Sequence, residues 1–321
     1  MARNVTISAI GGPYPHVDPA LGHAEMWEKV KEHWIKEIAL VALDKPDLIA
    51  LTEMCDLPFP SSYKMDFAVK FADGRGDDNL RFFSRVAKDN NANLSFSTVA
   101  RGQGDYYTNT MFIMDRQGNV AGQYDKYYVT GGENDANILY GETTPVFKLD
   151  FGTAACAICF DLNFEDLRDQ YKEKKPEIII FASQFHGGLM QQMWANTIRA
   201  YFVGSIAHQR PSSVLSPMGE TVAFSTDYYK HATAKLNLDY ELVHLKDKDK
   251  ADAMKNKYGA GVTLYDPNYL GYFMLINDMP GICVHDLLKE FDIISYGDYM
   301  IQSRQRREKD GNRGASAAVS L

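Results

Sequence analysis

The segment Glu177–Ser183, with the sequence EIIIFAS, constrains the fold of this chain more than any other segment. Side chains on a β-strand point alternately to opposite faces, so a strand with one face in water alternates polar and apolar residues. Here every residue between Glu177 and Ser183 is apolar. This pattern indicates a strand buried on both faces, and therefore a sheet that is covered on each side.

Helical and strand patterns alternate along the rest of the chain. Apolar residues between Met26 and Val41 recur at helical spacing and predict a long amphipathic helix. Asn4–Gly11 alternates as a strand does, and Thr108–Asp115 followed by Val120–Tyr124 predicts a hairpin. We therefore expect a mixed α/β fold.

The organisation of the chain shows no clear boundary in composition, so we expect one large domain over residues 1–302. Residues 303–321 contain five basic side chains followed by small residues, and there we expect a mobile or subunit-contacting tail. Residues 125–142 are polar and rich in glycine and lack a period. Such a long segment inside a compact domain is a candidate functional loop.

Charge and hydropathy exclude several classes of protein. With 34 basic and 42 acidic residues, the net charge of −8 disfavours a protein that binds nucleic acid. No apolar run approaches the roughly 18–20 residues of a membrane-spanning helix, and the first residues lack the apolar stretch of a signal peptide. We expect a cytoplasmic protein with neither a nucleic-acid nor a membrane partner.

Three residues with reactive side chains stand where predicted strands meet loops: Glu53, Lys126 and Cys159. Taken singly, a cysteine there is most often a small buried side chain, and a lone charge is most often solvated. Together they offer a nucleophile, a base for its proton and a positive donor for an oxyanion. The spacing in sequence does not show that the three residues meet.

Other uses of the four cysteines are disfavoured. Cys156 and Cys159 form a C-x-x-C pair inside an apolar strand, where residues three apart point to opposite faces and cannot readily join in a disulfide. A zinc site that also used Cys55 and Cys283 lacks a second C-x-x-C, and the histidines show no metal-binding spacing. We expect no metal and no cofactor.

Three motifs in the right order resemble those of the nitrilase superfamily, the carbon–nitrogen hydrolases. Leu48–Glu53 (LIALTE) resembles the strand that ends in the base, and Gly122–Lys126 (GQYDK) resembles the strand that leads to the catalytic lysine. Ala157–Phe164 (AICFDLNF) resembles the nucleophile motif. The resemblance implies a four-layer α-β-β-α sandwich and a homodimer or higher homo-oligomer.

The resemblance also implies roles for individual residues. Glu53 would be the general base, Lys126 the oxyanion donor and Cys159 the nucleophile, with the backbone N–H of Phe160 as a second donor. Glu133 matches a second glutamate that many members use to position the substrate. The implied reaction is hydrolysis of a small amide through a thioester, with release of ammonia or an amine.

Departures from the family pattern narrow the expected substrate. Asn163 stands where many amidases have an arginine, which puts an acidic substrate in doubt, and Phe160-Asp161 stands where nitrilases tend to have Trp-Glu. The second departure favours amide hydrolysis, with a nitrilase or an N-carbamoyl amidohydrolase of the same superfamily as the alternative. The presence of all three catalytic-type residues disfavours an inactive binding protein. Candidate pocket residues, besides Phe160, are Tyr63, Phe185 and His186.

Overall fold

The computed structural model describes residues 1–311 apart from 19, 59–63, 103, 209 and 268. Within this part, the chain forms two compact units, one of residues Val5–Leu236 and one of Met1–Asn4 together with the segment from Asn237 onward. In the described residues, no helix is both long and apolar enough to cross a membrane.

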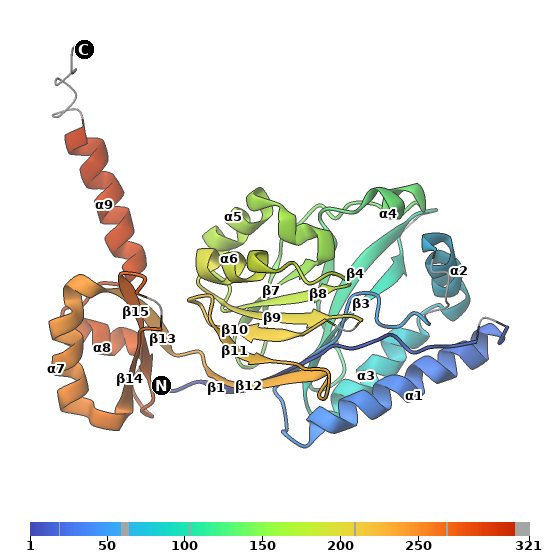
Figure 1. Ribbon diagram of the computed structural model, residues 1–321, viewed down its shortest axis with the longest axis horizontal. Helices are drawn as coiled ribbons and strands as arrows, with labels where there is room; N and C mark the ends of the chain where they lie inside the picture. Colours follow the sequence, from blue (N-terminus) through green and yellow to red (C-terminus); the bar gives the residue numbers. More distant parts are fainter. Residues whose placement is uncertain (19, 59–63, 103, 209, 268, 312–321) are drawn as a thin grey trace, which may run out of the picture. The chain divides into compact units, whose positions relative to one another are not determined.

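The larger unit is built on two six-stranded sheets (Figure 1). The first sheet has the order β12 (His231–Asn237), β1 (Asn4–Ile10), β2 (Leu48–Ala50), β3 (Asn93–Arg101), β4 (Tyr107–Met114), β5 (Val120–Asp125). The second sheet has the order β11 (Thr221–Phe224), β10 (Ser213–Leu215), β9 (Tyr201–Ile206), β8 (Ile178–Ser183), β7 (Thr153–Ile158), β6 (Val146–Lys148).

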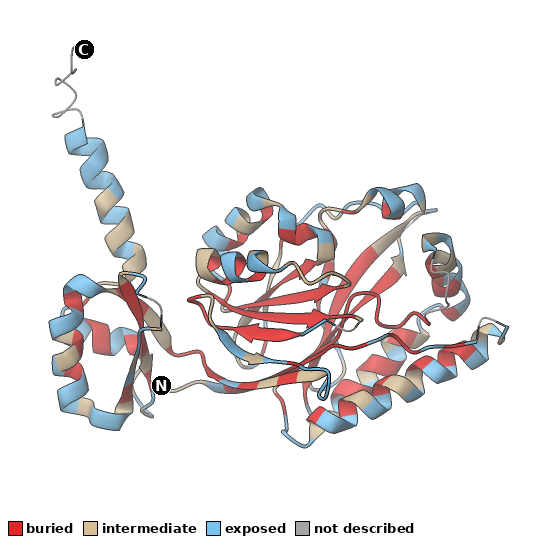
Figure 2. Ribbon diagram, viewed as in Figure 1, coloured by how far each residue is buried: buried red, intermediate tan, exposed pale blue. Residues whose placement is uncertain are grey.

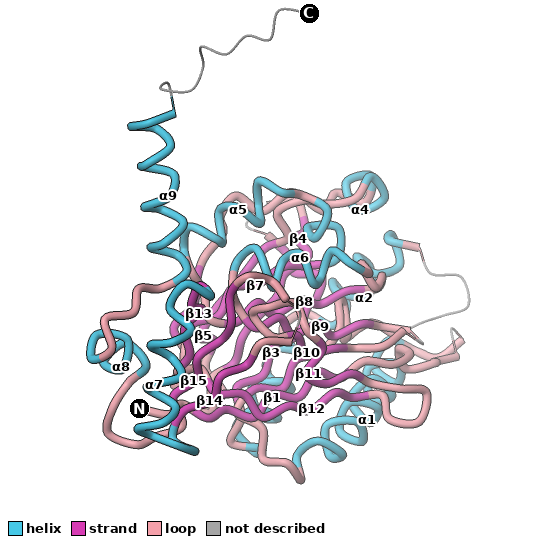
Figure 3. The backbone as a smooth tube through the Cα atoms, turned by 60° about the vertical axis from the view of Figure 1, so that its left-hand side comes forward, coloured by secondary structure: helices cyan, strands magenta, loops and turns pink. Residues whose placement is uncertain are grey.

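The two sheets face each other, and helices cover their outer faces. Ser205 on β9 donates a hydrogen bond of 2.8 Å to the carbonyl oxygen of Ala50 on β2, which joins the sheets directly. Helices α1 (His23–Ala42), α2 (Met65–Arg75) and α3 (Asp78–Asn90) pack with the first sheet, and α5 (Glu165–Lys174) and α6 (Leu189–Ile198) pack with the second (Figure 3). The expected four-layer α-β-β-α sandwich is confirmed.

The patterns of the larger unit have direct structural counterparts. All six residues of β8 are buried, and β8 pairs in parallel with both β7 and β9. The buried side chains of α1 follow the apolar pattern between Met26 and Val41, and β4 and β5 form the expected antiparallel hairpin. Figure 2 shows burial concentrated on the strands and on the inward stripe of α1.

The smaller unit has a core of its own. An antiparallel sheet with the order β13 (Tyr240–His244), β15 (Tyr272–Asn277), β14 (Val262–Tyr265) packs its apolar side chains with α7 (Lys248–Tyr258) and α8 (Val284–Glu290). Composition alone predicts one domain over residues 1–302, whereas here the third sheet and its helices enclose a separate cluster of apolar side chains.

The expected tail is helical where the structure describes it. Helix α9 (Tyr296–Asp310) begins at Ser295, whose hydroxyl accepts the N–H of Asp298 at 3.0 Å. Residues 303–310 therefore continue a regular helix, and the rest of the expected tail, from residue 312, lies outside the described residues.

Candidate active site

Glu53 lies three residues beyond the end of β2 and is buried to 2% exposure. The phenol of Tyr14 donates to its carbonyl oxygen, and the backbone N–H of Gln184 donates to its side-chain Oε2 at 3.1 Å. The next residue, Met54, has a positive φ of 46° and lies in the turn that follows β2. These contacts hold the Glu53 carboxylate at the carboxyl ends of the strands.

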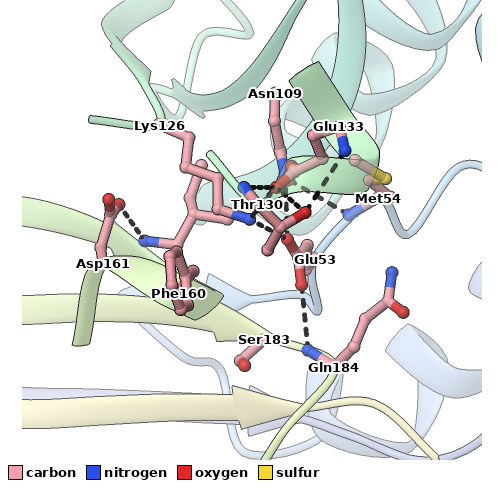
Figure 4. Close-up of polar contacts among 12 residues, drawn as sticks. Glu53, Met54, Asn109, Lys126, Thr130, Glu133, Phe160, Asp161, Ser183 and Gln184 are labelled. Carbon is pink, nitrogen blue, oxygen red and sulfur yellow. Dashed lines mark hydrogen bonds and ion pairs between the residues drawn. The ribbon is translucent and has the colours of Figure 1, made fainter. Parts of the chain in front are cut away.

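Lys126 follows β5 directly and brings its ammonium between two carboxylates (Figure 4). Its Nζ lies 3.1 Å from Oε1 of Glu53 and 2.8 Å from Oε2 of Glu133. Burial alone would lower the pKa of Lys126, but the charges of Glu53 and Glu133 raise it above its ordinary value. The side chain is therefore a fixed positive charge.

Glu133 lies in the short helix α4 (Gly131–Asp135), inside the segment that lacks a sequence period. The backbone N–H and the hydroxyl of Thr130 donate to Oε2 of Glu133 at 2.8 and 2.9 Å, so Thr130 caps the helix. Burial would raise the pKa of Glu133, but the Lys126 ammonium and several hydrogen-bond donors lower it below its usual range.

Cys159 is the first residue of a 3-10 turn that follows β7. Its φ is +48°, a left-handed value that residues with a Cβ seldom adopt. Glu53, Lys126 and Ser183 all lie close enough to its thiol to affect the ionisation of that thiol. Burial, reinforced by the charge of Glu53 and only partly opposed by Lys126, raises the pKa of the Cys159 thiol to about 12.

Asp161, two residues after Cys159, is fully buried and anchors the turn. Its carboxylate accepts the backbone N–H of Ile158 at 2.9 Å, the backbone N–H of Tyr128 at 2.7 Å and the phenol of Tyr124 at 2.7 Å. Burial raises the pKa of Asp161 to about 6, although these donors oppose the shift. Asp161 thus connects the turn that holds Cys159 to the segment that follows Lys126.

The four residues expected to be catalytic therefore lie together. Of the residues expected to line the pocket, Phe160 and Phe185 directly follow Cys159 and Gln184 in the chain. Phe160 is partly exposed, with its ring edge-on to Phe164 at 5.1 Å. Phe185 is half-buried, with its ring 6.4 Å from that of Phe181.

Of the two remaining pocket candidates, the structure describes His186. His186 lines a cavity of about 290 Å³ whose other described walls come from α6 and the β10–β11 hairpin, not from the catalytic candidates. Tyr63 lies outside the described residues.

Several residues that complete the site were not singled out by the sequence patterns. Asn109 on β4 donates from Nδ2 to Oε1 of Glu53 at 2.9 Å and to Oε1 of Glu133 at 2.8 Å. In the sequence Asn109 stands between Thr108 and Thr110, so no local signal sets it apart in its strand. Thr130 and Glu133 fit the S/T-x-x-E pattern of a helix start, which could have predicted α4.

The arrangement has the parts of a covalent acyl-transfer site. A partly buried thiol lies beside a carboxylate that can accept its proton, and an ammonium held by two carboxylates can face a developing oxyanion. Among the described residues, no group of three His, Cys, Asp or Glu side chains could hold a metal ion. The chemistry that this geometry supports is attack by sulfur on an electrophilic carbon.

Comparison with known proteins points in the same direction. A family model described as carbon-nitrogen hydrolase matches residues 9–230. The omega-amidase NIT2 of Xenopus tropicalis is 21% identical over 217 residues, covering 60% of this chain and 77% of the relative. A protein named hydrolase in agr operon, from Staphylococcus lugdunensis, is 22% identical over 211 residues, covering 60% of this chain and 88% of the relative.

Solved structures share the fold at low identity. A double mutant of an amidase from Nesterenkonia sp. AN1, in complex with acrylamide, superposes with a TM-score of 0.64 and 13% identity, covering 73% of this chain and 91% of that one. Nit3 of Saccharomyces cerevisiae, a member of the nitrilase superfamily, superposes with a TM-score of 0.62 and 16% identity, covering 80% and 95%. At such identities the likeness establishes the fold.

Proposed function

Because the chain belongs to the carbon–nitrogen hydrolase family, we propose that it hydrolyses the C–N bond of a small amide through a thioester on Cys159. One observation carries this proposal: the Lys126 ammonium lies 3.1 Å from Oε1 of Glu53, and the charges of both groups act on the Cys159 thiol beside them. The family and its amidase relatives support amidase-like chemistry. The catalytic roles of Glu53, Lys126 and Cys159 and the choice of substrate are our proposal.

The first half of the reaction forms the thioester. With its pKa at about 12, the Cys159 thiol keeps its proton at neutral pH, so Glu53 accepts that proton as sulfur bonds to the amide carbon. The carbonyl oxygen becomes an oxyanion, which the Lys126 ammonium and the backbone N–H of Phe160 stabilise. Glu53 then gives its proton to the amide nitrogen, the C–N bond breaks, and ammonia or an amine leaves.

The second half releases the acid. Glu53, again a carboxylate, takes a proton from water, and the oxygen of that water attacks the thioester carbon. The C–S bond breaks, the carboxylic acid leaves, and sulfur recovers a proton from Glu53. Glu133 contacts the Lys126 ammonium through both carboxylate oxygens, at 3.0 and 2.8 Å, so its proposed role is to hold the ammonium in place.

The test is an ammonia-release screen across primary amides, carbamoyl amines and nitriles. Omega-amides belong in it because curated relatives are named omega-amidases. Release from an amide by the wild-type protein and not by Cys159→Ala supports the proposal. Release of ammonia from nitriles alone would identify a nitrilase, and release from carbamoyl amines alone would identify an N-carbamoyl amidohydrolase. Release from none of the compounds overturns the proposed reaction. Pairing of two subunits remains a prediction, which analytical ultracentrifugation tests.

A further inference from the structure

Two buried polar side chains of the first sheet, Asn109 and Ser97, complete the hydrogen bonding of the proposed base. We propose that Ser97 and Asn109 form a positioning pair that engages Oε1 of Glu53 and leaves Oε2 to receive the thiol proton. This inference rests on the proposed function, because it assigns a task to the same carboxylate. Neither residue touches the reacting atoms, so both are positioning residues.

Ser97 and Asn109 stand on neighbouring strands, β3 and β4, and both are fully buried. The Ser97 hydroxyl accepts the backbone N–H of Met54 at 3.1 Å and lies 2.9 Å from Oδ1 of Asn109. Met54 is the positive-φ residue that directly follows Glu53. One hydroxyl therefore connects the backbone at Glu53 to the side chain that binds its carboxylate.

The direction of each hydrogen bond follows from the groups involved. A carboxylate only accepts, so Asn109 must turn its NH₂ group toward Glu53 and Glu133 and its oxygen toward Ser97. Ser97 accepts from Met54 and can satisfy the Asn109 oxygen only by donating its own proton. The opposite orientation of the amide would bring its oxygen against two carboxylate oxygens (Figure 4).

The two oxygens of Glu53 consequently differ. Oε1 receives Asn109 Nδ2 at 2.9 Å and Lys126 Nζ at 3.1 Å, which together use the two lone pairs of that oxygen. Within the described part of the chain, Oε2 accepts the backbone N–H of Gln184 at 3.1 Å. The remaining lone pair of Oε2 is therefore the one available for the proton of Cys159.

The test compares Asn109→Leu and Ser97→Ala with Ser95→Ala. Ser95 lies two residues away on the same face of β3 and is equally buried, but among the described residues its hydroxyl has no hydrogen-bond partner. The readouts are kcat, KM and the pH dependence of kcat/KM on the best amide. A second readout is the rate at which iodoacetamide alkylates Cys159, with Cys283 as the reference.

For Asn109→Leu we expect kcat to fall about 10- to 100-fold, with KM changed less than about 3-fold. The acid limb of the kcat/KM profile should move up by about one pH unit, because an anionic base loses donors. Ser97→Ala should change kcat and the pH profile in the same direction, but by less. In both variants iodoacetamide should alkylate Cys159 more slowly. Ser95→Ala should match the wild type in every readout.

The failure of this proposal is distinguishable from the failure of the proposed function. If the wild type hydrolyses an amide and Asn109→Leu keeps the wild-type kcat and pH profile, the positioning role is overturned and the hydrolase remains. If no amide is hydrolysed, the alkylation of Cys159 still tests the positioning role. A variant in which the alkylation rate depends on pH as it does in the wild type overturns that role. Should Asn109→Leu fail to fold, Ser97→Ala carries the same comparison.

Discussion

The phenol of Tyr124 donates a hydrogen bond of 2.7 Å to the buried carboxylate of Asp161. Tyr124 belongs to β5 of the first sheet, and Asp161 belongs to the turn that follows β7 of the second. The bond therefore joins the strand that leads to Lys126 to the turn that begins with Cys159. The relative position of the proposed nucleophile and of the proposed oxyanion donor depends on this connection between the sheets.

Tyr124→Phe should lower the free energy of unfolding by about 1–2 kcal/mol, because it removes one donor from a buried carboxylate. Urea denaturation measures the change. Tyr128→Phe is the matched control, since the Tyr128 phenol bonds Asp166 at 2.6 Å near the surface, and it should change stability by less than about 0.5 kcal/mol. Equal losses in the two variants would contradict a special role for the bond between the sheets.

Cys159→Ala should reduce ammonia release by at least about 10³-fold while circular dichroism shows an unchanged fold, because the nucleophile is lost. Cys156→Ala offers a control in the same motif. Cys156 is fully buried on β7, so its replacement should cost stability without abolishing turnover. Full activity in Cys159→Ala would refute the proposed nucleophile.

Lys126→Met should affect both activity and folding. Removal of the ammonium leaves the buried carboxylates of Glu53 and Glu133 without their counter-charge, and we expect a loss of about 3–5 kcal/mol in unfolding free energy. The loss of oxyanion stabilisation should lower kcat/KM by about 10²–10³-fold. The exposed Lys148→Met is the control, and a Lys126→Met enzyme with wild-type kcat/KM would rule out the oxyanion role.

Glu133→Gln should change how stability depends on pH. A carboxyl group whose pKa is lowered by folding stabilises the native state above its ordinary pKa of 4.5, and this stabilisation is lost as pH falls through the lowered value. The wild type should therefore exceed the variant in stability at pH 7 and lose that advantage below about pH 4.5. Urea denaturation from pH 7 to pH 3.5 measures the difference.

The exposed Glu142→Gln variant is the control for this measurement. If the difference between wild type and Glu133→Gln stays constant over the whole pH range, the ion pair with Lys126 does not govern the titration of Glu133.

Local patterns predicted much of the larger unit. The helical period between Met26 and Val41 identified the buried stripe of α1, because every third or fourth side chain shares one face of a helix. The apolar run of β8 identified a strand covered on both faces, because an exposed face would require alternation. The order of three motifs, together with the family resemblance, identified the residues that meet at the site.

The missed features depend on pairing between distant segments. Ser97 and Asn109 are ordinary polar residues in their own strands, and their meeting requires that β3 and β4 pair in one register. In the third sheet, β13 pairs with β15 although helix α7 and strand β14 lie between them in the sequence. A local pattern does not indicate such a pairing. Helix α4 was missed because five residues are too few to establish a helical period.

The left-handed backbone conformation at Cys159 lowers stability at the residue that we propose as the nucleophile. Glycine adopts a φ of +48° without the steric cost, on the order of 1–2 kcal/mol, that a Cβ adds. Folding alone would therefore favour glycine at this position, and a cysteine there fits the proposed role of its sulfur as the nucleophile. If substitutions were ranked only by thermal stability, Cys159→Gly would rank high, and the proposed nucleophile would be lost.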